Sequence, residues 1–355
     1  PYANVRVRLS PPNGARPSKA HLDVNTPTPD LLPRFRRWAI WAIAIGAILY
    51  VVGTVWAGFS EVGAELLNFA WWLYVPVLLL TLVNYGLRWV KWRYLLGRLG
   101  LSLPWREDAT LFIAGLAMVI SPGKAGELLK PYVVSKRTGV NLATTIPALL
   151  TERITDGIAM LALAAISVST YAADRVAWVA VPSALLGAAL VVLMSEPLSM
   201  GSVDLLARLP GVGRLAPKIR ELLMALRICL SPGALLWTVV LSLVAWFAEC
   251  VGFWLIFIGM GVEASLDAST FLYAFSTIAG GAMPGGLGVA DGALAGGAVT
   301  LLGVNEAVAV TSALLVRVAT LWFGVLLGAV ALLRFESLIG GGPAAETAET
   351  QSEGA

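Results

Sequence analysis

Two arginines lie inside stretches of this sequence that are otherwise apolar, and they are the residues best suited to chemistry. Arg153 and Arg317 each stand within a run long enough to cross a bilayer. A charge at the centre of a membrane helix costs roughly 2.5–3.5 kcal/mol on insertion scales, so it needs a reason. Because a guanidinium group donates in pairs to phosphoryl oxygens, both are predicted to bind a phosphate. The alternative is that they only neutralise Glu127, Asp156 and Asp291.

Carboxylates in the same stretches form a second set of candidates. Glu127 and Asp291 follow related proline–glycine motifs, where each is a candidate to bind a cationic headgroup or a coupling proton. The alternative for both is that they complement the dipole at the start of a helix. Glu152 and Asp156 are spaced i,i+4 on one helical face, and Asp156 is also spaced to pair with Arg153.

Glu249 is the remaining acid in a long apolar run. We expect it to relay protons, a role for which Glu152 is a second candidate, or to pair with one of the two arginines. Asn84 and Tyr85 are candidates to line the same cavity, although hydrogen bonding between helices is the commoner role of such residues in membranes.

An interrupted apolar segment, residues 270–302, must position several of these groups; we name it the second hairpin. Its two arms have about 14 residues each, which is too short to span a bilayer. Between the arms stand the residues Pro284, Gly285, Gly286 and Gly288, which break a helix. Broken backbone at membrane depth survives only where protein or a water-filled cavity satisfies its amides. We therefore predict a re-entrant hairpin with a functional tip.

Residues 108–137, the first hairpin, repeat this pattern. A short apolar arm, Ala109 to Ile120, leads into Ser121-Pro122-Gly123-Lys124-Ala125-Gly126-Glu127. Lys124 is a further candidate phosphate ligand, and the helix starts after Gly126 and Gly288 would add backbone N–H groups for the same anion. Lys130 is expected to extend to the membrane interface. Gly288 and Gly292 also have the spacing of closely packed helices.

The two hairpins belong to two related halves of the chain. Pro-Gly-x-x-Gly occurs at Pro122 and again at Pro284, and Gly139-Val-Asn recurs as Gly303-Val-Asn. Arg153 and Arg317 are separated by the same interval as those two glycines. Paired interrupted segments in two halves are the best sequence indication of a transporter binding site, so we predict an internal duplication around one.

Composition places the chain among multi-pass membrane proteins. It has 355 residues, of which 58% are hydrophobic and 13% charged. Two cysteines and one histidine exclude a disulfide framework and a zinc site.

Lys and Arg gather in the segments 88–106 and 196–232 and are missing from 58–68, 261–269 and 303–306. By the positive-inside rule, both termini are expected in the cytoplasm, with the chain in the cell (plasma or inner) membrane.

The sequence divides into three parts. We expect a disordered cytoplasmic arm over 1–33, a transmembrane domain over 34–339 and a disordered tail over 340–355. Within the domain, repeat one covers about 69–171 and repeat two about 234–333. The cytoplasmic loop 196–232 lies between them and contains an amphipathic segment, 203–227, which is interrupted at Pro210 and Pro217. Full spans are expected near 38–57, 69–87, 149–171, 177–195, 234–260 and 307–333.

The orientation of these spans gives the expected fold class. The first hairpin would enter from the cytoplasmic side and the second from the outside, which makes the two repeats inverted copies. We expect an all-α polytopic membrane protein with about six full spans plus two re-entrant helical hairpins, arranged as inverted-topology repeats. This is the architecture of alternating-access carriers.

The motifs as a set resemble the transmembrane family of lysylphosphatidylglycerol synthases. The resemblance covers roughly residues 38–333 and rests on Pro122-Gly-Lys-Ala-Gly126-Glu127, Glu152-Arg153-x-x-Asp156, Pro284-Gly-Gly-Leu-Gly288 and the helix of Arg317. That family is similar to the flippase part of bacterial multiple peptide resistance factors. The resemblance implies movement of a lipid between leaflets, with Arg153, Arg317, Glu127 and Asp156 at matching positions. One departure is Asp291, where the family pattern implies glutamate.

We therefore expect a lipid flippase or transporter that moves a phosphate-bearing lipid, a phospholipid or a lipid-linked precursor. Its expected partner is an anionic or zwitterionic membrane lipid and not a nucleic acid, and a homodimer is compatible with the sequence. Nucleotide-loop, zinc-protease and serine-hydrolase motifs do not occur, so we expect neither an enzyme nor a cofactor. Lysyl transfer is not expected either, because no aminoacyl-transferase domain follows.

Two alternatives belong to other functional classes. One is a membrane enzyme acting on a lipid-linked substrate, which loss of turnover on substitution of Glu127 or Asp156 would favour. The other is an accessory subunit of an envelope-synthesis complex, which a stoichiometric partner and no translocation in isolation would favour.

Overall fold

The structure is a computed structural model that describes residues 58–121, 126–171, 176–207, 213 and 215–340, together with six isolated positions between 41 and 55. The predicted arm over 1–33, most of the predicted span near 38–57, Lys124 and the tail beyond residue 340 lie outside the described residues.

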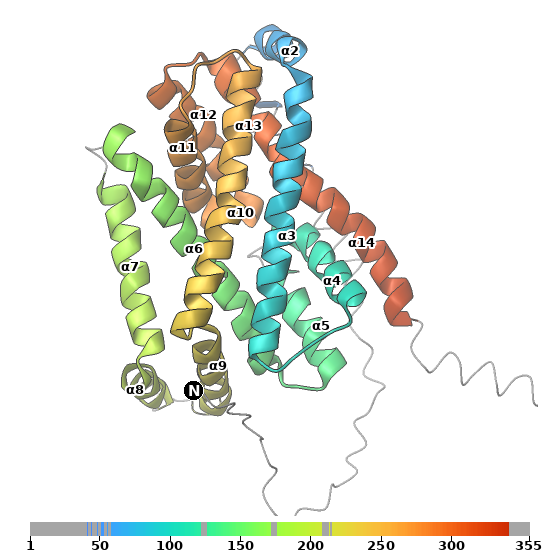
Figure 1. Cartoon of the computed structure of the whole chain (residues 1–355), viewed down its shortest axis with the longest axis vertical. Helices are drawn as coiled ribbons and strands as arrows, with labels where there is room; N and C mark the ends of the chain where they lie inside the picture. The colour runs from blue at the N-terminus through green and yellow to red at the C-terminus, as the bar shows by residue number, and fades with distance from the viewer. Residues whose placement is uncertain are drawn as a thin grey trace, which may run out of the picture.

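Regular structure in the described ranges is entirely helical (Figure 1). The helices are α2 (Phe59–Asn68), α3 (Tyr74–Arg98), α4 (Trp105–Ala117), α5 (Leu129–Thr138), α6 (Leu142–Tyr171), α7 (Ala177–Met194), α8 (Glu196–Ala207), α9 (Ala216–Cys229), α10 (Pro232–Gly259), α11 (Leu266–Ala279), α12 (Val289–Leu302), α13 (Glu306–Arg317) and α14 (Phe323–Gly340). The all-α prediction is confirmed.

Four helical stretches are long and apolar enough to cross a membrane, which makes this a multi-pass membrane protein. They are Trp71–Arg98, Pro232–Gly259, Pro284–Leu302 and Glu306–Leu332. A fifth arises if Val179–Met194 and Glu196–Leu205, bent by 87° at their junction, form one broken span. Six full spans are not recovered from the described residues, partly because α6, although 30 residues long, has three charged residues near its middle.

The cytoplasmic segment predicted over 88–106 is partly wrong. α3 continues unbroken to Arg98, and Arg88 and Lys91 are buried inside the molecule. Their charges are neutralised by acids of α6, so they contribute nothing to a basic interfacial loop. In the 196–232 loop, the structure has two helices, α8 and α9, and Pro217 stands in the first turn of α9, where proline is well tolerated.

The two helical arms and the break predicted for the second hairpin are present, but Pro284–Leu302 is itself long and apolar enough to cross a membrane, so the re-entrant course stays a prediction. α11 and α12 have 14 residues each and pack against one another, in the upper part of Figure 1. At 1.5 Å per residue, such an arm is roughly 21 Å long, against about 30 Å of bilayer hydrocarbon. Gly285, Gly286 and Gly288 between the arms have φ values of 59°, 72° and 80°, which L-residues with side chains rarely adopt.

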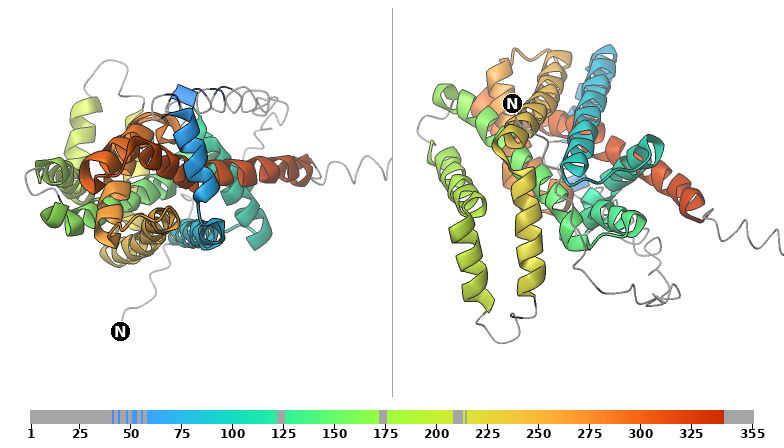
Figure 2. Two further views of the ribbon diagram at one scale, coloured as in Figure 1. Left: turned by 90° about the horizontal axis from the view of Figure 1, so that it is seen from above. Right: turned by 60° about the horizontal axis from the view of Figure 1, so that its bottom comes forward.

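The first hairpin consists of α4 and α5, in the lower part of Figure 1, with residues 122–125 outside the described ranges. α4 packs closely on α14, which crosses the bundle obliquely and extends beyond it (Figure 2). The tips of the two hairpins meet, since Ile120 of the first packs in one apolar cluster with Leu287 of the second and Leu321.

Local structure repeats at the interval seen in the sequence. α6 begins at Leu142 and α13 at the corresponding position, Glu306. Each follows a glycine in the left-handed region, Gly139 with φ 74° and Gly303 with φ 66°. The side chains of the next asparagines, Asn141 and Asn305, accept hydrogen bonds from backbone N–H groups at the start of these helices.

Candidate functional site

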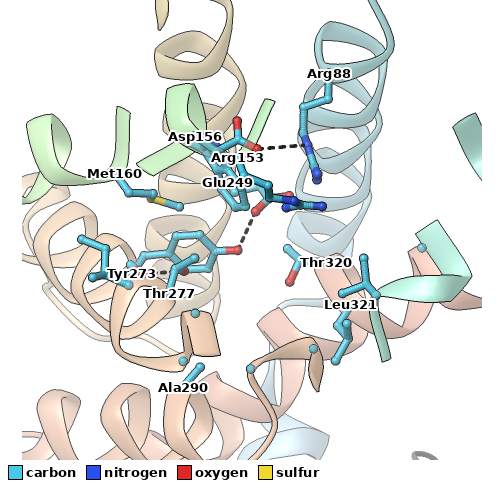
Figure 3. A pocket seen from close by; sticks show the side chains of 18 of the residues that line it. Arg88, Arg153, Asp156, Met160, Glu249, Tyr273, Thr277, Ala290, Thr320 and Leu321 are labelled. Atoms are coloured by element: carbon cyan, nitrogen blue, oxygen red, sulfur yellow. Dashed lines mark hydrogen bonds and ion pairs between the residues drawn. The ribbon is translucent and has the colours of Figure 1, made fainter. Parts of the chain in front are cut away.

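A cavity of about 540 Å³ lies where the hairpin tips meet the central helices α3, α6, α10 and α13 (Figure 3). Its polar lining comprises Tyr85, Arg88, Glu127, Arg153, Asp156, Trp246, Glu249, Tyr273, Thr277, Arg317 and Thr320. Gly285, Gly286, Gly280 and Gly281 supply bare backbone to the same wall. The structure thus brings most of the predicted site residues to one place.

The two arginines predicted to bind phosphate both line this cavity, and each holds a carboxylate. Arg153 Nε lies 2.9 Å from Glu127 Oε2. Arg317 Nε lies 2.8 Å from Asp291 Oδ1, and its Nη2 donates to the carbonyl of Gly285 at 2.5 Å. Each arginine follows its acid at the same distance along the chain, so the two ion pairs are equivalent in the two halves. The alternative was that the two arginines only neutralise Glu127, Asp156 and Asp291. Two of these three acids, Glu127 and Asp291, are paired with the arginines in this state.

Asp291 also binds the start of α12. Its Oδ2 accepts from the backbone N–H of Gly288 at 2.8 Å, in the manner of a capping box. In the first hairpin, the N–H of Gly126 donates to Ser121 Oγ at 2.7 Å. The N–H groups of Gly126 and Gly288 thus have acceptors within the protein, and binding of an anion by the N–H groups that follow them stays a prediction.

Behind the cavity lies a buried charge network that joins α3, α5 and α6. Lys91 Nζ lies 2.5 Å from Asp156 Oδ1, and Lys130 Nζ lies 2.6 Å from Glu152 Oε2. Arg88 lies 3.4 Å from Glu152 and 3.9 Å from Asp156. The fully buried hydroxyl of Ser242 on α10 adds a hydrogen bond with Lys91 at 2.7 Å. Buried ions of this kind are tolerated only when paired and hydrogen-bonded.

This network corrects two predictions. The local ion pair between Arg153 and Asp156 does not form, because Arg153 turns to Glu127 while Asp156 is held by α3. Lys130 does not reach the interface; its ammonium group is buried against Glu152 and lies 4.5 Å from the centre of the Trp92 ring. A carboxylate within reach and an aromatic face together stabilise the cation inside the protein.

Sequence reasoning missed the contribution of α3. Arg88 and Lys91 were assigned to a loop, yet they share a polar stripe with Thr81, Asn84 and Tyr85. These residues recur at intervals of three and four, which places them on one face of a helix. That periodicity was the available signal, and the stripe continues directly from the predicted span.

Three further side chains shape the cavity. Tyr273 donates to Glu249 Oε2 at 2.6 Å, and Tyr85 donates at 2.7 Å to the carbonyl of Thr320 in the π-helical turn Val318–Trp322. A π turn leaves carbonyl groups without their usual partners, and such turns are frequent at functional sites. Asn84 is buried and donates to the carbonyl of Ala245, so it joins α3 to α10 as the commoner interpretation predicted.

Donors remain available for a ligand. Arg88 Nε and Trp246 Nε1 have no hydrogen-bond acceptor among the described residues, and Arg153 Nε lies close to Glu127 without pointing its N–H at the carboxylate. The side chain of Arg153 is 33% exposed, and the guanidinium of Arg88 lies over the Trp246 ring at 5.4 Å. Buried donors of this kind normally have a partner, so this arrangement suits an anion with several oxygens.

Comparison with known proteins agrees with the motifs. A family model described as the lysylphosphatidylglycerol synthase TM region matches residues 40–328. A UPF0104 membrane protein of Methanothermobacter thermautotrophicus (strain Delta H) is 26% identical over 325 residues, covering 83% of this chain and 92% of the relative. The matched region contains both hairpins, the buried charge network and the whole lining of the cavity.

Proposed function

We propose, since this chain belongs to the family of the lysylphosphatidylglycerol synthase TM region, that it moves a phosphate-bearing lipid between the leaflets of the cell membrane. The observation that carries the proposal is the cavity itself. Arg88, Arg153 and Arg317 face one space of about 540 Å³ inside an apolar helical body. A charged headgroup does not enter hydrocarbon unaided, because losing its water is too costly. Guanidinium donors inside the protein would replace that water.

The two halves support an alternating-access interpretation. Helix starts, left-handed glycines and arginine–carboxylate pairs recur at one common interval along the chain, and the tips of both hairpins meet beside the cavity. If the first hairpin enters from the cytoplasm and the second from outside, these are inverted-topology repeats with a site at the bilayer midplane. Rocking one half against the other would then expose the same arginines to each leaflet in turn.

The ion pairs provide the exchanges that such a cycle needs. In the state described, Glu127 forms an ion pair with Arg153, and Asp291 forms one with Arg317. An incoming phosphate would replace these carboxylates on the guanidinium groups, since both anions accept the same paired donors. The carboxylates would return when the lipid leaves. Arg153, which is more exposed and lacks a hydrogen bond at Nε, would be the first to make contact.

Native mass spectrometry of lipids retained by the purified protein tests the proposed ligand class. We expect enrichment of a phosphate-bearing lipid in the wild type and its loss in Arg153→Ala and Arg317→Ala. Hydrogen bonds to a charged group contribute about 1.5–3 kcal/mol, which corresponds to roughly ten- to hundredfold weaker retention for each variant. Arg137→Ala is the matched control, because Arg137 makes a partly exposed ion pair with Glu107, away from the cavity.

Movement between leaflets is tested in vesicles containing phosphatidylglycerol with a fluorescent acyl chain, by following the fraction that an external quencher can reach. We expect the wild type and Arg137→Ala to expose the inner pool and the two cavity variants to be slow. Retained lipids that only mirror the membrane, with all variants alike, would make the arginines structural and would refute the proposal.

A further inference from the structure

The carboxyl group of Glu249 differs from every other buried acid of the described residues. It lies near the middle of α10 and is 4% exposed, and its Oε2 accepts a hydrogen bond from Tyr273 at 2.6 Å. Within the described residues, no lysine or arginine makes an ion pair with it. The other buried acids of the described residues each have such a partner, namely Asp108, Glu127, Glu152 and Asp156, and so does the half-buried Asp291.

Several ionisable groups surround the same space as Glu249, from each neighbouring element. Figure 3 shows Arg88, Arg153 and Asp156 near it, with Tyr273 opposite. Among the described residues, this set is Tyr85 and Arg88 of α3, Glu127 before α5, Arg153 and Asp156 of α6, Tyr273 of α11 and Arg317 of α13. The cations of this set are occupied by carboxylates other than Glu249.

The lysines and arginines around the cavity outnumber the carboxylates that pair with them. Among the described residues, the lysines and arginines of the cavity and its network are Arg88, Lys91, Lys130, Arg153 and Arg317, and the acids paired with them are Glu127, Glu152, Asp156 and Asp291. Five cations face four carboxylates. With Glu249 ionised, this group is neutral; with Glu249 protonated, it has one unmatched positive charge. Uncompensated charge in an apolar interior is strongly unfavourable, so one state requires a ligand.

We propose that Glu249 binds a proton that accompanies one negative headgroup charge through the cavity. The inference rests on the proposed lipid movement and names its coupling. A proton from water forms an O–H bond on the Glu249 carboxylate, and the excess positive charge then attracts one phosphate charge. On the other side, the O–H bond breaks, the proton passes to water and the lipid leaves. The carboxylate alone then balances the cations while the empty protein returns.

Tyr273 has a positioning role in this scheme. Its hydroxyl keeps its own proton and donates to Glu249 Oε2, which leaves Oε1 as the oxygen that gains and loses the transported proton. Neither the empty ionised state nor the loaded protonated state leaves a net charge on the described residues of the cavity and its network. Proton and lipid therefore move in the same direction, one proton for each negative charge.

Infrared spectroscopy tests the proton on Glu249 without any knowledge of the lipid. The protein is placed in vesicles of phosphatidylethanolamine and phosphatidylglycerol and titrated from acid to alkaline pH. We expect a carbonyl band of a protonated carboxylic acid that titrates in the wild type and is missing from Glu249→Gln. Glu263→Gln, the same change at an acid in the loop between α10 and α11, should keep the band. An unchanged band in Glu249→Gln overturns the proposal.

A pH gradient across the same vesicles tests the coupling, with fluorescent phosphatidylglycerol as the probe. We expect the gradient to speed lipid movement several-fold in the wild type and in Glu263→Gln. In Glu249→Gln, the ratio of rates with and without the gradient should fall to one, and Glu249→Asp, which keeps a titratable group, should restore part of it. An equal ratio in the wild type and Glu249→Gln overturns the coupling. A wild type that moves no labelled lipid contradicts the proposed function instead, while the infrared result still decides whether Glu249 takes up the proton.

Discussion

Lys130→Met is the substitution whose effect the structure defines best. Lys130 is buried on α5, and its ammonium group lies 2.6 Å from Glu152, whose side chain is fully buried. The methionine would fill similar space but leave Glu152 with Arg88, at 3.4 Å, as its one ion-pair partner among the described residues. Removing one partner of a buried ion pair costs about 3–5 kcal/mol, because the remaining charge is left in the low-dielectric interior. Loss of the cation–aromatic contact with Trp92 adds to this cost.

A matched control lies further along α5. Arg137 pairs with Glu107 at 2.7 Å, but their side chains are 38% and 20% exposed. Exposed ion pairs contribute about 0.2–1 kcal/mol, so Arg137→Met removes the same kind of contact at a small fraction of the cost. At roughly 2 °C for each kcal/mol in a long chain, Lys130→Met should lower the melting temperature by about 6–10 °C and Arg137→Met by at most about 2 °C.

The chain contains its own reporter for this measurement. Its two cysteines, Cys229 and Cys250, are both free and buried. A thiol-reactive fluorescent dye therefore labels the protein in detergent only when it unfolds, and the labelling midpoint on heating gives the apparent melting temperature of each variant. Because such unfolding is rarely reversible, the comparison requires one heating rate for all variants.

A double variant separates loss of the ion pair from a packing defect. In Lys130→Met with Glu152→Gln, the stranded charge is gone, so at least half of the lost melting temperature should return. The reasoning is wrong if the two substitutions lower the midpoint additively, or if Lys130→Met lowers the midpoint no further than Arg137→Met does. Either result would mean that charge burial does not determine the stability of this region.

Three further predictions use the same assay. Gly328→Ala should destabilise by about 1–3 kcal/mol, because its methyl group would lie 2.5 Å from the backbone nitrogen of Ala117, whereas Gly292→Ala meets nothing within 4 Å and should be neutral or stabilising. Gly285→Ala should destabilise the protein by about 1–2 kcal/mol, because alanine is strained at the positive φ of 59°. The measured effect is a lower midpoint temperature of labelling. Asp291→Asn should lower the midpoint by a few degrees, since the start of α12 loses a charged cap.

Sequence reasoning located the helices and the second hairpin because their signals are local. Pro284 and its neighbouring glycines break a helix wherever they occur, and the arms of 14 residues on either side follow directly. The same approach placed Arg153 and Arg317 beside one cavity, since their surroundings repeat in both halves. It also suggested close packing at Gly292, where the structure has open space.

Pairing partners were the part that sequence could not provide. Arg317 has no acid within four residues along the chain, yet Asp291 reaches it across the second hairpin at 2.8 Å. Lys91 and Lys130 look like ordinary basic residues beside a membrane, and only the convergence of α3 and α5 on Glu152 and Asp156 makes them internal. The hydropathy of a segment reports its average environment, whereas a buried charge depends on a partner far away in sequence.

The repeated ion pairs and Glu249 suit two different roles. The pairs Arg153–Glu127 and Arg317–Asp291 occur in both halves, which suits a ligand that must be held equally well from either side. Glu249 lines the same cavity but makes no ion pair with a lysine or arginine of the described residues. The repeated pairs thus fit binding of the headgroup, and the unmatched acid fits coupling, because a single group must take up and release the proton.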